Sequence, residues 1–215
     1  MDLEKTFTEI YQSNFWGSAE SRSGEGSTVM YAGSLMETLI ELIKEYKVER
    51  MLDIACGDWN WMKRLAERLP DYTGLDIVEE LVVNNNLTHG NSHTRFVHTD
   101  SLSFLEDQKD KSFDFLLCRH MIQHLPTAYN IQLLKEACRV SKRLLITSYR
   151  TCQHNEDIPS SWGPTFRPIN LELEPYDFMN KYFDRYIYDG PISKPSVYKD
   201  PSVYPLYMGL YITQE

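Results

Sequence analysis

The stretch that most constrains the fold is 51–63, M-L-D-I-A-C-G-D-W-N-W-M-K. It begins with a short apolar run that contains one acid, Asp53, and small residues follow at positions 55–57. An amphipathic helical pattern starts near Trp59. A strand that turns at a glycine and leads into a helix holds nucleotide-type cofactors, because small residues let a ligand approach the backbone. The stretch therefore predicts a cofactor site at the end of a strand, although a tight turn without a ligand would give the same pattern.

The residues around the glycine indicate which cofactor fits. A dinucleotide site requires G-x-G-x-x-G and a pyrophosphate at the helix N-terminus. Here only Gly57 is present, Asp58 puts a negative charge where the pyrophosphate would lie, and Trp59 adds bulk. These features disfavour NAD and suit S-adenosylmethionine, which has no phosphate and carries a cationic sulfonium.

Three more strand patterns follow. Residues 72–77 end near Asp76, about 20 residues beyond the glycine, where a carboxylate can accept both ribose hydroxyls. Residues 95–101 end in Asp100-Ser101, which could bind an adenine amino group, and 112–120 is strongly apolar. Because helical patterns separate these strands, the sequence predicts a parallel α/β sheet with one ligand edge.

These motifs give the chain its resemblance to a known family. L-D-I-A-C-G-D-W-N-W, G-L-D-I, H-T-D-S and F-D-F-L-L-C-R-H-M-I-Q-H-L-P resemble the motifs of class I S-adenosylmethionine-dependent methyltransferases. The segments E-S-R-S-G-E-G-S-T, N-E-D-I and R-P-I-N-L are similar to those of small single-domain members. The resemblance implies a Rossmann-like, seven-stranded sheet with helices on both faces and an antiparallel last strand. It also implies one domain over 1–215, with an N-terminal helix and lid (1–32), a cofactor-binding core (33–150), and an acceptor loop with closing strands (151–215).

The cofactor residues expected from this reading lie at the strand ends. Asp53 and the backbone of residues 55–57 should hold the methionine end of S-adenosylmethionine, and Cys118 or Arg119 should flank the sulfonium. The full set is Asp53, Ala55, Cys56, Gly57, Trp59, Asp76, Ile77, Asp100, Ser101, Cys118 and Arg119.

Two histidines after the fourth strand are candidate bases or acceptor ligands. His120 and His124 are spaced i and i+4, which puts them on one face if the segment is helical, and histidine is the natural base near neutral pH. The alternatives are a structural role for His124 and a polar pocket wall at His120. A metal on these histidines would need further ligands from residues 154–157, and we expect none.

Acceptor contacts are expected from two segments. The polar, glycine-rich residues 21–28 resemble a lid that brings Arg22 to the acceptor, although composition alone equally fits a surface loop. The long loop 151–173 and its surroundings contribute Arg150, Asn155 and Arg167 by resemblance. The expected acceptor is a hydroxyl group of a sugar, a glycan or another small molecule. The alternatives are a protein or peptide N-methyltransferase and a non-catalytic binding module.

The composition and charge of the chain exclude some classes of binding partner. A net charge of −9 argues against general nucleic-acid binding, which needs a basic face. No apolar run reaches the length of a membrane span, and the N-terminus lacks the pattern of a signal peptide, so we expect a cytoplasmic protein without a membrane partner. Four cysteines without C-x-x-C spacing predict reduced thiols.

Overall fold

The computed structural model describes residues 2–158, 166–190 and 207–214. Seven strands form one sheet in the order β3-β2-β1-β4-β5-β7-β6. Strands β1 to β5 are parallel, and β7 is antiparallel to both of its neighbours. This topology confirms the expected Rossmann-like sheet with an antiparallel last strand. The strands are β1 (Arg50–Ile54), β2 (Asp71–Asp76), β3 (Thr94–His98), β4 (Phe115–Cys118), β5 (Arg143–Ser148), β6 (Phe183–Tyr188) and β7 (Tyr207–Ile212).

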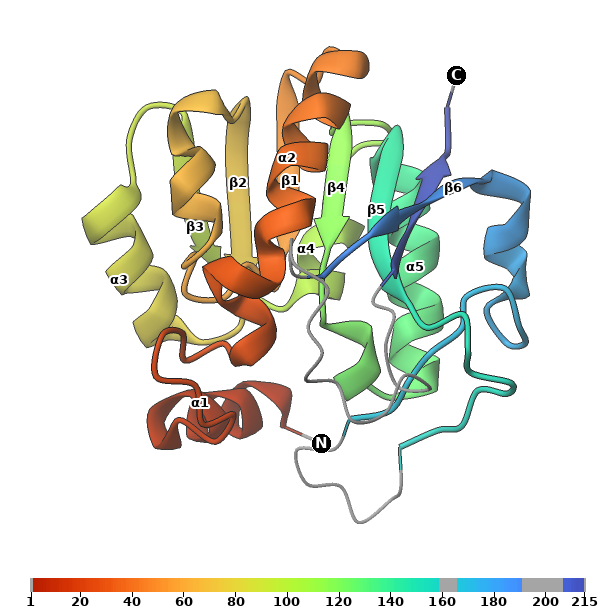
Figure 1. Cartoon of the computed structure of the whole chain (residues 1–215), viewed down its shortest axis with the longest axis horizontal. Coiled ribbons are helices and arrows are strands. Elements are labelled where there is room, and N and C mark those ends of the chain that lie inside the picture. Colours follow the sequence, from red (N-terminus) through yellow and green to blue (C-terminus); the bar gives the residue numbers. More distant parts are fainter. Residues whose placement is uncertain (1, 159–165, 191–206, 215) are drawn as a thin grey trace.

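Helices cover both faces of the sheet (Figure 1). The central strands are buried on both sides, which is why their sequences are nearly continuous apolar runs. The apolar core on one face includes residues of α2, η2 and α3, and the core on the other includes residues of α4, α5 and η4. These helices are α2 (Val29–Glu45), η2 (Met62–Arg68), α3 (Glu79–His89), α4 (Ser101–Glu106), α5 (Thr127–Val140) and η4 (Asp177–Tyr182).

The N-terminal helix α1 (Leu3–Ser13) lies across the carboxyl ends of the parallel strands (Figure 1). Asp2 caps its first turn, and Asn14 ends it in the left-handed conformation. Two contacts tie it to the β2–β3 side of the sheet: Glu4 Oε1 lies 3.2 Å from His98 Nε2, and Gln12 lies 3.5 Å from Glu80. Residues 14–28, which join α1 to α2 and contain η1 (Glu25–Ser27), are called the cover segment below.

The segment after β1 differs from the sequence prediction. An α-helix was expected to start near Trp59, but the chain forms a loop and then the 3-10 helix η2. Trp59 has a φ of 55°, a left-handed conformation that an α-helix cannot contain. The proline-rich stretch 191–205 and the loop around Trp162 lie outside the described residues.

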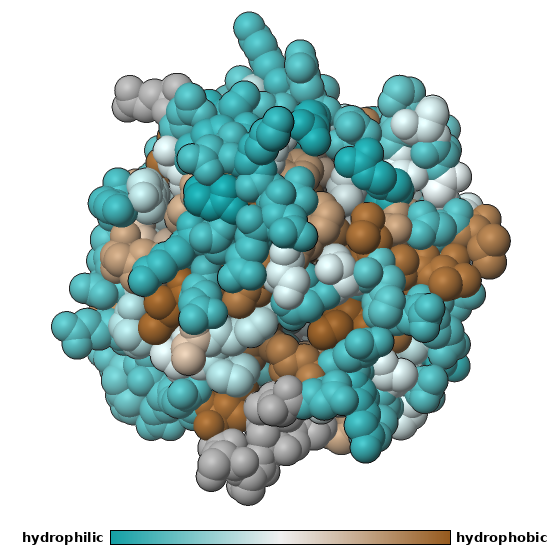
Figure 2. Space-filling model, turned by 180° about the vertical axis from the view of Figure 1, so that it is seen from behind, coloured by the Kyte–Doolittle hydropathy of each residue, from teal (hydrophilic) through white to brown (hydrophobic). Residues whose placement is uncertain are grey.

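The surface does not present one continuous apolar band on the face shown in Figure 2, where hydrophobic groups are separated by hydrophilic ones. Among the described helices, none is both long and apolar enough to cross a lipid bilayer. The large apolar side chains that the described residues expose are Phe15, Met30, Val83, Leu87, Phe166 and Tyr188.

Candidate functional site

The main cavity lies at the carboxyl ends of β1, β2, β3 and β4 and has a volume of about 430 Å³. Ligands bind at this edge of an open α/β sheet, because the loops after the strands meet there. Helix α1 and the cover segment complete its wall. The residues predicted from the sequence that line it are Ala55, Gly57, Asp76, Ile77, Asp100, Ser101, His120, His124 and Arg22.

A smaller inner cavity of about 70 Å³ adjoins it, because residues such as Gly57 and His120 line both. Its walls come from the loop after β1, the loop after β4 and the cover segment. The predicted cofactor residues Asp53, Cys56 and Arg119 line it.

Asp53 is a buried carboxylate that accepts a hydrogen bond from the Tyr72 hydroxyl at 2.6 Å. Burial raises the pKa of Asp53 to about 7. A buried acid normally finds a cation or several donors. Asp53 is therefore poised to accept a positively charged group in the inner cavity.

The loop after β1 brings backbone groups to both cavities. Ala55 and Gly57 have φ angles of 56° and 59°, a conformation that costs alanine energy and glycine little. The Gly57 N–H donates to Asp76 at 3.0 Å, which fixes the loop against the end of β2. The positive φ therefore explains why a glycine stands at position 57 in this turn.

Trp59 lies away from the cavities, contrary to its prediction as a cofactor contact. It is 2% exposed and packs against Tyr72, Phe96 and His89 at ring distances of 4.9 to 5.5 Å. It lines neither cavity. The left-handed backbone turns its large ring into the core, where burial stabilises it more than exposure in the loop would.

Asp76 and Asp100 present carboxylates to the main cavity. Asp76 accepts hydrogen bonds from the N–H groups of Gly57 and Val78, both at 3.0 Å, and burial raises its pKa. Asp100 caps α4 by accepting from the Ser103 N–H at 2.9 Å, and it accepts from the Tyr129 hydroxyl at 2.8 Å. Both acids are held by donors of this chain and keep lone pairs for a ligand.

Cys118 and Arg119 do not flank the main cavity. Cys118 is buried in the sheet, where burial raises the pKa of its thiol, and it lines neither cavity. The Arg119 guanidinium instead forms a bidentate pair with the buried Asp189 and donates from Nη1 to the Gly26 carbonyl at 2.7 Å. Arg119 therefore joins the loop after β4 to the cover segment.

Sequence reasoning missed Asp189. This acid directly follows β6, is fully buried, and lies next to both Arg119 and His120. Burial alone would raise the pKa of Asp189, but Arg119 and His120 outweigh it and lower the pKa to about 2. An acid at the end of a strand was the available signal, but the long connection before β6 hid its position in the sheet.

The two histidines do not share a helix face, which corrects that expectation. His120 has a φ of 55°, and only Ile122–His124 forms a 3-10 turn, η3. The His120 N–H donates to the Thr147 hydroxyl at 2.9 Å, and its Nε2 lies 3.4 Å from Asp189 Oδ2. Burial and then Arg119 lower the pKa of His120, so its imidazole is neutral at neutral pH.

The cover segment is attached to the loop after β1 through Asp58. Its carboxylate accepts from the Ser21 hydroxyl and the Arg22 N–H, both at 2.9 Å, while its own N–H donates to Ser23 Oγ at 2.9 Å. Asp58 carries the negative charge that disfavoured a pyrophosphate. Its role in the structure is to hold the segment that contains Arg22.

Three predicted acceptor residues lie outside both cavities. The Arg150 guanidinium stacks on Tyr186, 4.2 Å from the ring centroid, and Arg167 donates to the Leu125 carbonyl at 2.6 Å. The Asn155 amide group donates to three backbone carbonyls of residues 170–174. Asn155 and the Arg167 Nη2 group therefore hold backbone carbonyls, while Arg150 packs on a side-chain ring. Among the described residues of this loop, Phe166 lines the main cavity.

Within the described ranges, no group of three or more His, Cys, Asp or Glu side chains could hold a metal ion. His154 and Glu156 pair with each other at 3.0 Å on the exposed loop. Neither residue lines the cavities that contain His120.

Comparisons with known proteins agree with this geometry. Residues 51–143 match the family model of a methyltransferase domain. The fold is similar to a SAM-dependent methyltransferase from Anabaena variabilis (TM-score 0.65, 13% identity, covering 99% of this chain and 95% of that one). It is also similar to magnesium protoporphyrin IX methyltransferase from Synechocystis with bound SAM (TM-score 0.61, 14% identity, covering 99% of this chain and 95% of that one). A third similar structure is a SAM-dependent methyltransferase from Archaeoglobus fulgidus (TM-score 0.54, 15% identity, covering 82% of this chain and 93% of that one).

The comparison with curated proteins found no match. The low identities to the solved structures make the structural likeness one of fold. Together, the comparisons show a methyltransferase domain over residues 51–143 and a fold shared with S-adenosylmethionine-dependent methyltransferases.

Proposed function

We propose that this enzyme transfers a methyl group from S-adenosylmethionine to a hydroxyl group of a sugar, a glycan or another small molecule. The observation that carries the proposal is the main cavity, where carboxylates at the ends of β2 and β3 and the neutral His120 line one space beneath α1 and the cover segment. When bound, the cofactor supplies a methyl group on a positively charged sulfur.

The buried acid Asp53 fits the ammonium group of the cofactor. Burial raises the pKa of its carboxylate to about 7, although the nearby Arg119 and the Tyr72 hydroxyl oppose this shift. An ammonium in the inner cavity would stabilise the ionised form of Asp53. Arg119 and Ser23 also line this cavity and could orient the methionine carboxylate.

The acids at the next two strand ends fit the nucleoside. Asp76 lines the main cavity and accepts from Gly57 and Val78 on different oxygens, and its remaining acceptor capacity suits ribose hydroxyls. Asp100 and Ser101 line the main cavity one strand further along, where an adenine amino group could donate to them. In this assignment the buried Trp59 ring packs in the core beneath the loop after β1 and contacts no ligand.

His120 is our candidate for the base. Its neutral imidazole can take the proton of an acceptor hydroxyl, and Asp189 beside Nε2 would stabilise the imidazolium that forms. Asp189 also favours the tautomer with the proton on Nε2, which leaves the lone pair on Nδ1 as the proton acceptor. Alignment of the hydroxyl behind the methyl carbon would supply much of the remaining rate.

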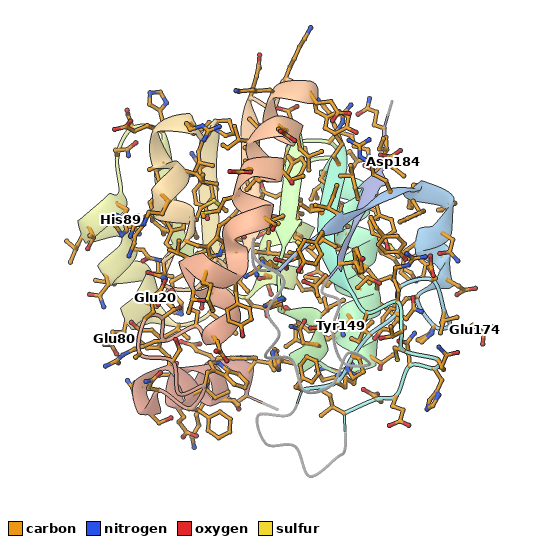
Figure 3. The ribbon with its side chains drawn as sticks, viewed as in Figure 1. Glu20, Glu80, His89, Tyr149, Glu174 and Asp184 are labelled. Atoms are coloured by element: carbon orange, nitrogen blue, oxygen red, sulfur yellow. The ribbon has the colours of Figure 1, made fainter. Side chains whose placement is uncertain are left out.

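The two alternatives lack a supporting feature. A peptide N-methyltransferase would be favoured by an acidic groove built from Glu156, Asp157, Glu172 and Glu174, which would attract basic peptides. None of these residues lines the cavities, and Glu174 lies at the outer edge of the molecule (Figure 3). A binding module would be favoured if Trp59 blocked the cofactor pocket, but the Trp59 ring is buried in the core and lines neither cavity.

The test is calorimetric titration of S-adenosylhomocysteine into the native protein and into Asp76→Ala. We expect micromolar binding to the native protein and loss of binding in the variant. Labelled S-adenosylmethionine with a panel of hydroxylated small molecules and basic peptides, with and without a chelator, then identifies the acceptor class. Native protein that fails to bind S-adenosylhomocysteine, or that methylates only peptides, would overturn the proposal.

A further inference from the structure

Four rings from separate segments line one end of the main cavity: Trp16, His124, Tyr149 and Phe166. Trp16 and His124 have ring centroids 5.0 Å apart, His124 and Phe166 6.1 Å, and Tyr149 and Phe166 5.5 Å. They form a continuous series of ring contacts, which we call the aromatic arc. It lies beyond β4 and β5, and Figure 3 shows Tyr149 below the end of the sheet on that side.

The arc is separate from the residues assigned to the nucleoside. The α1 contacts with His98 and Glu80 place that helix near the ends of β2 and β3. His124 of the arc and His120 both belong to the segment after β4 and line the same cavity. A ligand on the arc would therefore lie at the acceptor end of the cavity, next to the candidate base.

Gln123 supplies a second, independent observation. It lines the main cavity and is 2% exposed, yet its Oε1 has no hydrogen-bond partner among the described residues. A buried amide oxygen without a donor costs about 1–3 kcal/mol. This oxygen is suited to accept a hydrogen bond from an O–H or N–H group of a ligand.

The surroundings of the arc favour a ring with few polar substituents. Met121 and Leu125 add apolar surface beside the rings. A sugar would bring several hydroxyl groups into this surface, and each one left unpaired would cost about 1–3 kcal/mol. A planar aromatic ring instead gains offset or edge-to-face contacts, worth about 0.5–1.5 kcal/mol per pair.

The acidity of the acceptor hydroxyl also favours an aromatic acceptor over a sugar. A phenol has a pKa of about 10, as in the tyrosine side chain. An aliphatic hydroxyl is a far weaker acid than a phenol, close to water in acidity. A neutral imidazole is a weak base, so His120 can take a phenolic proton far more readily than the proton of a sugar.

We infer that the acceptor is a phenol whose ring stacks in the aromatic arc and whose neighbouring O–H or N–H substituent donates to Gln123; this inference rests on the proposed function. The phenolic oxygen forms a bond to the methyl carbon as the carbon–sulfur bond breaks. The bonding electron pair stays on sulfur, which becomes an uncharged thioether, and the hydroxyl proton passes to His120.

The experiment begins with S-adenosylhomocysteine calorimetry and continues with labelled S-adenosylmethionine and matched acceptors. These are catechol, 2-aminophenol and phenol, with cyclohexane-1,2-diol and glucose as saturated counterparts. We expect the two substituted phenols to have kcat/KM at least about tenfold above the saturated compounds. Turnover of glucose or the saturated diol with inert phenols would overturn this inference and leave the proposed function standing. Cofactor-product binding without turnover of any phenol would also overturn it, and absent binding would overturn both.

Variants test the two observations separately. Gln123→Leu should lower kcat/KM for catechol about tenfold or more, while unsubstituted phenol changes little, because phenol has no donor for Oε1. Phe166→Leu should raise KM for all three phenols. The matched controls are Gln108→Leu and Phe178→Leu, which lie outside both cavities, and all four variants should keep the native affinity for S-adenosylhomocysteine. Equal losses for catechol and phenol in Gln123→Leu would contradict the assigned hydrogen bond.

Discussion

Arg119 and Asp189 form a buried bidentate ion pair although 70 residues separate them in the chain. Arg119 Nε donates to one carboxylate oxygen at 2.9 Å and Nη2 donates to the other at 2.8 Å. Arg119 Nη1 also donates to the Gly26 carbonyl. The pair therefore joins the loop after β4, the end of β6 and the cover segment beside His120.

Replacing Asp189 by Asn should destabilise the protein by about 3–5 kcal/mol, because the variant leaves the Arg119 guanidinium buried without its counter-charge. Urea unfolding followed by both fluorescence and circular dichroism measures this loss. The matched control is Asp184→Asn, which removes a partly exposed carboxylate near the opposite end of β6 (Figure 3). The control should change stability by less than about 1 kcal/mol, and equal effects of the two variants would show that the Arg119 pair is not special.

The affinity for S-adenosylhomocysteine should rise with pH between about 6 and 8, because Asp53 must be ionised to bind an ammonium group and its pKa is about 7. Binding should release protons in this range, which calorimetry in buffers of different ionisation enthalpy detects. Asp53→Asn should bind more weakly, with no such proton release. Affinity of the native protein that does not change with pH would exclude Asp53 as the ammonium partner.

The same carboxyl gives a stability prediction of opposite direction. In the unliganded protein the pKa of Asp53 is higher when folded than when unfolded, so the folded state binds more protons between pH 4 and 7. The contribution of Asp53 to the free energy of unfolding should therefore fall as pH rises through this range. Asp53→Asn should remove this component and be more stable than the native protein at pH 8, without ligand. Denaturant unfolding at pH 5 and pH 8 measures the difference.

Gly57 and Ser23 should be energetically coupled. A Cβ at Gly57 would overlap the Ser23 side chain, and its φ of 59° adds strain for alanine. Gly57→Ala should displace the cover segment and weaken S-adenosylhomocysteine binding, whereas the double variant Gly57→Ala, Ser23→Gly should recover part of the affinity because the overlap is removed. A double-mutant cycle on binding measures the coupling. Strictly additive losses would show that the cover segment does not press on this loop.

The pH dependence of kcat should report His120. Because burial and Arg119 lower the pKa of His120, kcat at saturating cofactor should stay constant down to about pH 6.5, the ordinary histidine value, and fall only below it. His120→Gln should lower kcat by about 10²–10⁴ and remove the acidic limb. The control is His93→Gln, because His93 is exposed and lines neither cavity. An unchanged acidic limb in His120→Gln would assign the base elsewhere.

Local sequence patterns predicted the sheet and the positions of the strand-end acids. Strand and helix periods depend on local patterns of apolar residues, and parallel strands put their carboxyl ends at one edge, so Asp76 and Asp100 could be located without coordinates. Gly57 was identifiable for a similar reason, since a tight turn into a ligand loop needs a residue that tolerates a positive φ.

Tertiary packing determines which side chains line the same cavity. The left-handed backbone at Trp59 places its ring in the core, and the left-handed backbone at His120 means that His120 and His124 do not share a helix face. Asp189 and Phe166 reached the site through long connections whose paths no local pattern encodes. Contacts between segments far apart in the chain depend on the packing of the whole fold, and the Arg119–Asp189 pair is the clearest case because each charge needs the other to be buried.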